Sequence, residues 1–303
     1  MAFTQYTNLD FEEIKVSLRE YLRANSNFTD FDFEGSNLSI LIDTLAYNTY
    51  VTAYNTNMVA NESFIDSATL RENIVALARN VGYVPSSRRA STANISFTVD
   101  LGSGTTKSSV TLKAGLVALG DFANTNYTFC VSEDITSPVT DGFAEFTIDI
   151  KQGTFVTNEF VVDTSQPNQK FIIPNPYVDT STLKVQVRDT LTSSSRKTYS
   201  QIDNIVGIST HSETFLIQEI QDEKYELLFG DGVLGKRLSN GNVINSTYIV
   251  TDGVGGNGVS NFSFSGKLVD NDGGLITSGI SGVITNERSS NGAEVESIDT
   301  IRN

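Results

Sequence analysis

The feature that most constrains the fold of this 303-residue chain is a change of hydrophobic period near residue 89. Before it, apolar residues recur every three or four positions, as on one face of a helix. After it, short runs alternate between apolar and polar residues, as half-buried strands do. The sequence therefore predicts an α+β chain, in which an N-terminal helical segment precedes a mostly antiparallel β-rich region.

Three helices are expected in the first part. The first begins at Asn8 or Asp10, whose side chains can cap the helix N-terminus. The second begins at Ser36 or Asn37, and its end is left open because the asparagines beyond residue 47 compete for their own backbone. The third is predicted over residues 67–81, before a glycine and a proline that stop it.

The remainder is expected to be β-rich, with short strands separated by clusters of turn-forming residues. The predicted strands are residues 94–99, 110–113, 127–131, 144–150, 159–162, 170–173, 183–188, 214–219, 224–229 and 243–250. Residues 270–291 are rich in Gly, Ser and Asn, so an extended loop or arm is expected there. The predicted division is a helical region (1–88), a β-rich body (89–269) and an arm (270–303).

The charge of the chain excludes two classes of partner. Asp and Glu number 36 against 21 Lys and Arg, which gives a net charge of -15. Such a field repels phosphate backbones and anionic membrane surfaces, so neither nucleic-acid binding nor membrane insertion is expected. The N-terminus lacks the pattern of a secretory signal. The lone Cys130 lies in an apolar run and is expected to be a buried thiol.

One glycine motif has the spacing of a phosphate-binding P-loop. Gly230, Gly235 and Lys236 match that motif, and Gly232 lies between them. Arg237, however, stands where the motif needs a hydroxyl for magnesium, and no helix is predicted to follow. A hairpin turn is therefore favoured over a nucleotide site.

A second glycine motif is a literal GxGxxG at residues 253–258 and includes Gly253 and Gly256. In a dinucleotide-binding fold this motif opens a helix. Here an alternating, strand-like run follows it, so a glycine-rich β connection is favoured. No cofactor is expected at either motif.

The other candidate chemistry is weak. His211 is the only histidine and lies in a polar loop, which favours a surface residue over a catalytic base. Residues 270–274 resemble a calcium loop, but Ser281 stands where the bidentate glutamate would bind. No catalytic residue and no metal ligand is assigned.

The second predicted helix is a candidate interface with partner helices. Its tyrosines offer large amphipathic contact area at modest entropic cost. The alternative is a helix packed on its own domain, and the sequence weighs the two evenly. The candidate interface residues are Leu38, Ile42, Leu45, Tyr47, Tyr50 and Tyr54.

Two segments resemble a known family. Residues 33–48 (FEGSNLSILIDTLAYN), 61–64 (NESF), Leu70-Arg71 and 82–85 (GYVP) strongly resemble the N-terminal region of the baseplate wedge proteins of T-even-like contractile-tailed phages. Residues 225–235 (YELLFGDGVLG) are similar to the central block of the wider baseplate J family. That similarity continues at Gly241, Ile244, Tyr248, Gly253, Gly256 and Asn257.

The resemblance implies a late structural protein of the virion, assembled in the bacterial cytoplasm and present in paired copies. Its partners are then a second copy, other wedge subunits and the sheath initiator. It also implies a switchable scaffold whose glycine-rich connections permit hinge motion. Members of this family usually continue past a segment like residues 293–302, so the C-terminus is expected to be either naturally short or truncated, and ring closure between wedges by this chain is left open.

A second function class is a carbohydrate-binding or glycan-hydrolysing tail protein, because β-rich phage proteins with long Gly/Asn loops often face cell-surface glycans. The chain has no tryptophan for a sugar-stacking platform, which disfavours this alternative.

Overall fold

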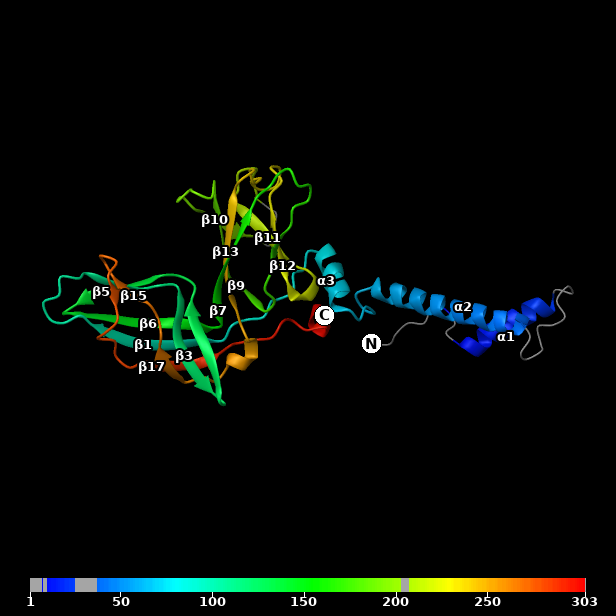
Figure 1. Cartoon of the computed structure of the whole chain (residues 1–303), viewed down its shortest axis with the longest axis horizontal. Coiled ribbons are helices and arrows are strands. Elements are labelled where there is room, and N and C mark those ends of the chain that lie inside the picture. The colour runs from blue at the N-terminus through cyan, green and yellow to red at the C-terminus, as the bar shows by residue number, and fades with distance from the viewer. Residues whose placement is uncertain (1–6, 8–9, 25–36, 203–206, 303) are drawn as a thin grey trace. The chain divides into compact units, whose positions relative to one another are not determined.

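The computed structural model describes residue 7 and residues 10–24, 37–202 and 207–302. The chain forms two compact units, shown in Figure 1. The helical unit comprises Met1–Tyr83 and Ile298–Asn303, and the β unit comprises Val84–Ser297. Helices followed by an antiparallel-rich β region confirm the predicted α+β class.

The first helix of the helical unit begins at one of its two predicted caps. Helix α1 (Phe11–Arg23) begins after Asp10, whose carboxylate accepts hydrogen bonds from the backbone of Glu12 and Glu13. The alternative cap Asn8 lies outside the described residues, as does Ser36. Helix α2 (Asn37–Glu62) is much longer than α1.

The many polar side chains of α2 do not interrupt it, because several of them bond within the helix. The hydroxyls of Thr44, Thr49, Thr52 and Thr56 each donate to the carbonyl four residues earlier. Each hydroxyl is thereby satisfied and its methyl group is left on the helix surface. This explains how a Thr- and Asn-rich segment continues as a helix to Glu62.

Two shorter helices complete this unit. Helix α3 (Arg71–Asn80) begins later than predicted, because residues 64–70 form turns and Leu70 takes the N-cap position. Gly82, with φ +82°, ends it as expected. Helix α4 (Ile298–Arg302) packs on α3, and Ile301 is buried with Ile74, among others.

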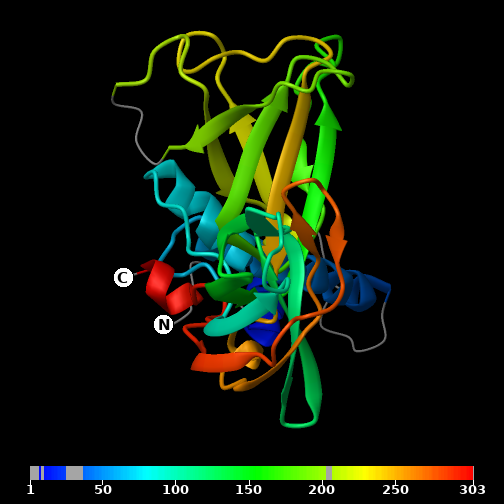
Figure 2. The same cartoon turned by 90° about the vertical axis from the view of Figure 1, so that its left-hand side faces the viewer.

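A ten-stranded sheet forms one part of the β unit. Its strands are β1 (Thr92–Asp100), β2 (Ser109–Leu112), β3 (Gly115–Phe122), β4 (Thr125–Val131), β5 (Ile135–Thr140), β6 (Phe143–Gln152), β14 (Asn261–Phe264), β15 (Leu268–Asp270), β16 (Leu275–Ile276) and β17 (Ile284–Ser290). Along β1 and β6 every second residue is buried, as the predicted alternation requires. The rings of Phe97 and Phe146 stack in its core with centroids 4.9 Å apart. Figure 2 shows the β3–β4 hairpin extending from this sheet.

A seven-stranded sheet forms the other part. Its strands are β7 (Thr154–Val161), β8 (Phe171–Ile173), β9 (Val178–Arg188), β10 (Lys197–Gln201), β11 (Thr214–Glu219), β12 (Tyr225–Phe229) and β13 (Val243–Val250). All described pairs are antiparallel except the short β10–β11 contact. Tyr248, Phe215 and Leu227 lie in its core.

Two structural expectations are wrong. Residues 270–291 are not an extended arm throughout, because β17 pairs with the central strand β1, with Thr92 opposite Ser290. Small polar residues such as Ser and Asn conceal this strand, since one of its faces is exposed. The turn at residues 230–237 does not join a hairpin either, because β12 pairs with β11 and β8, whereas β13 pairs with β7 and β9.

Candidate functional site

The predicted interface residues do not lie on one face of α2. Ile42 is only 2% exposed and points inward, whereas Leu38 and Tyr50 are half-buried. Leu45 and Tyr54 are about half exposed, and Tyr47 is 64% exposed. The structure thus places Ile42 inward and Leu45, Tyr47 and Tyr54 outward.

The outward surface of α2 carries more large apolar residues than the three predicted interface residues that lie on it. We call it the α2 outer face, and its large apolar residues are Ile40, Leu41, Leu45, Tyr47, Tyr54, Met58 and Val59, all of which are exposed. The signal that could have found it is the number of large apolar residues on this helix, which is more than one inward face can hold. Exposed polar residues such as Thr44 and Asn48 are interspersed among them.

The inner face of α2 packs on α1 through small and polar contacts. Its buried residues are Ser39, Ile42, Ala46, Asn57 and Asn61. Lys15 of α1 forms an ion pair with Asp43 at 2.6 Å. The side-chain amide of Asn57 donates to the hydroxyl of Thr7 at 2.7 Å. Polar side chains therefore make up part of the buried surface of α2.

Helix α1 has no buried residue at all. Tyr21 is 69% exposed and Val16 about half exposed, whereas Phe11, Ile14, Leu18 and Leu22 are half-buried. An isolated helix of this length is marginally stable in water without tertiary packing. The α1–α2 pair thus presents apolar surface that its own described residues do not cover.

The turn between α2 and α3 is organised by Glu62, within the NESF segment of the family resemblance. Its carboxylate accepts hydrogen bonds from the backbone and hydroxyl of Thr69, the backbone of Leu70 and the amide of Asn73. Partial burial raises the pKa of Glu62, but these hydrogen bonds outweigh that effect and lower the pKa to about 2. The carboxylate therefore stays ionised at the N-terminus of α3, where negative charge is favourable.

The P-loop-like glycines build a compact turn. A side chain at Gly230 would meet the carbonyl carbon of Gly235 at 2.2 Å, and Gly235 has φ +81°. The carboxylate of Asp231 accepts hydrogen bonds from the backbone N–H groups of Val233 and Leu234. These glycines thus serve close approach and turn geometry.

Lys236 is engaged within the fold. Its ammonium lies 2.7 Å from the carboxylate of Glu213, and this hydrogen bond raises the pKa of Lys236. In a P-loop the lysine reaches the phosphates and a helix follows the glycines. Here the described chain after Gly235 has no helix before β13.

The second glycine motif forms a short 3-10 turn, η2 (Gly253–Gly256), instead of opening an α-helix. A side chain at Gly256 would meet Gln152 and Ser91 at 2.6 Å, and one at Gly253 would meet the carbonyl oxygen of Ala293 at 2.9 Å. Glycine is required here for close packing and not for freedom to move. The hinge motion that the family resemblance implies for glycine-rich connections therefore has no support at residues 253–258.

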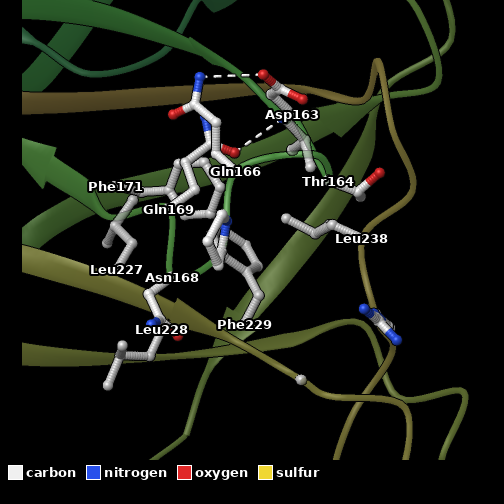
Figure 3. Close-up of a pocket in the computed structure, with 14 residues that line it drawn as sticks. Asp163, Thr164, Gln166, Asn168, Gln169, Phe171, Leu227, Leu228, Phe229 and Leu238 are labelled. Carbon is white, nitrogen blue, oxygen red and sulfur yellow. Dashed lines mark hydrogen bonds between the residues drawn. The ribbon is translucent and has the colours of Figure 1, made fainter.

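A pocket of about 350 Å³ lies at one end of the seven-stranded sheet (Figure 3). Phe171, Leu227 and Phe229 form its apolar lining, and the loop that includes Asp163 and Gln166 forms its polar side. Hydrogen bonding by Ser165 lowers the pKa of the Asp163 carboxyl. This ionised carboxylate is a poor general acid near neutral pH.

The remaining candidates have structural roles. Cys130 is buried, and burial raises the pKa of its thiol to about 12. In the loop at residues 270–274, the ammonium of Lys107 contacts both Asp270 and Asp272, where a calcium ion would lie. Within the part of the chain that the structure describes, no group of three His, Cys, Asp or Glu residues could hold a metal. No described helix is long and apolar enough to cross a membrane.

Comparison with known proteins points to one family. Residues 10–83 match the family described as baseplate wedge protein gp6-like, helical domain. Over 281 residues, or 86% of its length, the chain is 30% identical to the baseplate wedge protein gp6 of Enterobacteria phage T4. It spans 41% of the length of that relative. The resemblance to baseplate wedge proteins is confirmed, and the glycan alternative gains no support.

Proposed function

We propose that this chain, a homologue of the phage T4 baseplate wedge protein, is a structural subunit of a contractile tail baseplate that works by assembly and not by catalysis. Its partners are a second copy of itself, other wedge subunits and the sheath initiator. It uses no cofactor, nucleic acid or membrane. It assembles in the cytoplasm of the host bacterium and resides in the tail baseplate of the virion.

The uncovered surface of the α1–α2 pair is the observation that carries this proposal. A 13-residue helix without a buried side chain packs on a 26-residue helix whose outer face exposes seven large apolar residues. A concentration of exposed apolar side chains of this kind marks interaction sites. Helices of partner chains supply the missing packing in a bundle.

The inward and outward residues of α2 take different roles in this proposal. Leu45, Tyr47 and Tyr54 contact partner helices, together with the rest of the α2 outer face. Ile42 holds α2 on its own unit, and the half-buried Leu38 and Tyr50 lie at the margin of the two surfaces. The helical unit (residues 1–83 and 298–303) supplies assembly contacts, and the β unit (residues 84–297) forms the scaffold.

The baseplate switches when such contacts rearrange. Subunit interfaces hold the pre-contraction state, and their change releases the sheath. The turn glycines Gly230, Gly232, Gly235, Gly253 and Gly256 keep the β unit in its shape while the interfaces change.

The test is co-purification of the L45D/Y54D variant with co-expressed wedge subunits of the same phage. Both side chains are exposed, so the helical circular dichroism signal should be retained while partner binding is lost. The matched control is L191D/L275D, which places the same charges at exposed leucines of the β unit. A folded L45D/Y54D variant that recovers normal amounts of wedge partner would contradict the interface.

A further inference from the structure

The apolar residues of the α2 outer face fall into two stripes. Along one of them, the residues lie alternately four and three positions apart, which is the heptad spacing of a coiled-coil seam. The second stripe carries Leu41, Leu45 and Val59 and lies roughly 110° further round the helix, given about 3.6 residues per turn. We call the first stripe the aromatic seam, and it comprises Ile40, Thr44, Tyr47, Val51, Tyr54 and Met58.

The aromatic seam is open along its length in the described chain. Ile40, Tyr47, Tyr54 and Met58 are all exposed, and Val51 is half-buried. Helix α1 packs on a different side of α2, through the inner face already described, and Figure 1 shows α2 as one unbroken helix. The seam extends over about 27 Å at about 1.5 Å per residue. A partner helix can therefore lie along it without displacing α1.

The uncharged character of the seam points to a partner of the same kind. Between Asp43 and Glu62, α2 carries no charged side chain. Residues that flank a heptad seam commonly select the partner by charge, but Asn48 and Asn55 hold such positions here. A second copy of a chain with a net charge of -15 can approach this surface without bringing two rows of carboxylates together.

The polar groups around the seam are also self-complementary. Amide and hydroxyl side chains each donate and accept hydrogen bonds, as those of Asn, Thr and Tyr do here. Such a surface matches a copy of itself, as an isologous interface between two identical subunits requires. A helix with a charged seam would instead leave its charges unpaired against it.

We infer that the aromatic seam joins α2 to the α2 of a second copy of this chain in a left-handed coiled coil. This pairing rests on the proposed function and assigns one partner to one stripe of the α2 outer face. The seven-residue repeat imposes the left-handed supercoil. Tyr47 and Tyr54 alternate with the smaller Thr44 and Val51, so that the side chains of two copies interdigitate.

The second stripe stays accessible in this pairing. Leu41, Leu45 and Val59 point away from the seam, and all three are exposed. A helix of another wedge subunit can pack there while the second copy occupies the seam. One α2 helix thus binds two partner helices of different origin at the same time.

The test uses two differently tagged copies of the chain, which are co-expressed and purified through one tag. In Y47K/Y54K and in Y47E/Y54E, like charges meet across the seam, so each variant should retain on the order of tenfold less of its second copy than wild type does. Co-expression of the lysine variant with the glutamate variant should restore the wild-type recovery, because opposite charges then face each other. This holds for parallel and antiparallel helices, since both tyrosines of one copy receive the same charge.

The matched control places the same charges on the opposite side of α2. Thr49 and Thr56 are exposed and seven residues apart, as the two tyrosines are. The variants T49K/T56K and T49E/T56E should retain the second copy in every combination. Circular dichroism should show the wild-type helix content in all four variants, because every substituted side chain is exposed.

Two results would overturn the pairing of the seams. One is a wild-type chain that retains no second copy. The other is a mixture of lysine and glutamate variants that stays apart although wild type self-associates. If the seam variants retain each other but lose a wedge subunit, the seam binds that subunit, so the pairing is wrong while the assembly role stands. The assembly role itself fails separately, when L45D/Y54D recovers normal amounts of wedge partner.

Discussion

The carboxylate of Glu62 lies 2.7 Å from the side-chain amide of Asn73, and this contact joins the last residue of α2 to the first turn of α3. The same carboxylate also bonds to Thr69 and Leu70 in the intervening turn. The side chain of Glu62 thus links the end of the long helix to the start of the small α3–α4 core. Glu62 belongs to the NESF segment (residues 61–64), so this part of the family resemblance includes a residue that organises the turn between α2 and α3.

Replacing Glu62 by alanine should destabilise the helical unit by about 1–3 kcal/mol, because the donors that it satisfies lose a charged acceptor. The measurement is denaturant unfolding followed by helical circular dichroism. E72A, which removes an exposed acid from the first turn of α3, is the control and should have a much smaller effect. Equal losses in the two variants would exclude the special role of Glu62.

The contribution of Glu62 should also depend on pH in a defined direction. Its pKa is lowered to about 2 in the folded chain, from 4.5 as the unperturbed value. A depressed folded-state pKa stabilises the fold above the unfolded pKa, and this stabilisation is lost as the pH falls through the folded pKa. The stability difference between wild type and E62Q should therefore be constant near neutral pH and shrink from about pH 4.5 towards pH 2. A difference that grew on acidification would contradict the assignment.

The turn at residues 230–235 should not tolerate a side chain at its first position. In G230A, the new methyl group would lie 2.2 Å from the carbonyl carbon of Gly235, so the backbone must shift. Overpacking of this kind costs about 1–3 kcal/mol, measurable as a lower unfolding midpoint. G282A is the control, since nothing lies within 4 Å of the added methyl group there. Equal midpoints in G230A and G282A would show that the turn can relax.

Lys236 should have no role in nucleotide chemistry. Its ammonium bonds to Glu213, and Arg237 replaces the hydroxyl that a P-loop needs. Calorimetric titration of the wild-type chain with ATP and magnesium should give no binding heat, and K236A should leave any background hydrolysis unchanged. Tight ATP binding that is lost in K236A would refute this.

Sequence periodicity predicted the first three helices and most strands, because burial of one face imposes a repeat that local residues reveal. Strands β3, β5, β10 and β15 were not predicted, and β16 and β17 lie in the segment that was predicted to be an arm. Strands β15 and β16 are very short, and the others contain small or polar residues, such as Gly120 in β3 and Asn286 in β17, that weaken the alternation. Distance along the chain conceals only some of them, because β17 pairs with β1, whereas β3 and β5 form hairpins with β4 and β6.

The candidate interface shows the same limit. The sequence placed apolar and aromatic residues on α2, but it could not assign Ile42 to the inner face and Tyr47 to the outer one. That distinction depends on where α1 packs. The four residues missed on the outer face, Ile40, Leu41, Met58 and Val59, belong to the same helix, and the Thr and Asn residues interspersed among them obscure the apolar period.

The sequence by itself determined the α+β class, the turn chemistry of the glycines, the acidic surface and the family resemblance, since each resides in residue type and spacing. Only the tertiary structure decided that β17 joins β1, that Glu62 bridges two helices, and that α4 returns to the helical unit. The contacts of β17 and α4 join residues distant in the chain, and those of Glu62 span a turn whose path the local pattern does not specify. Their free energy exists only once the backbone has brought the partners together.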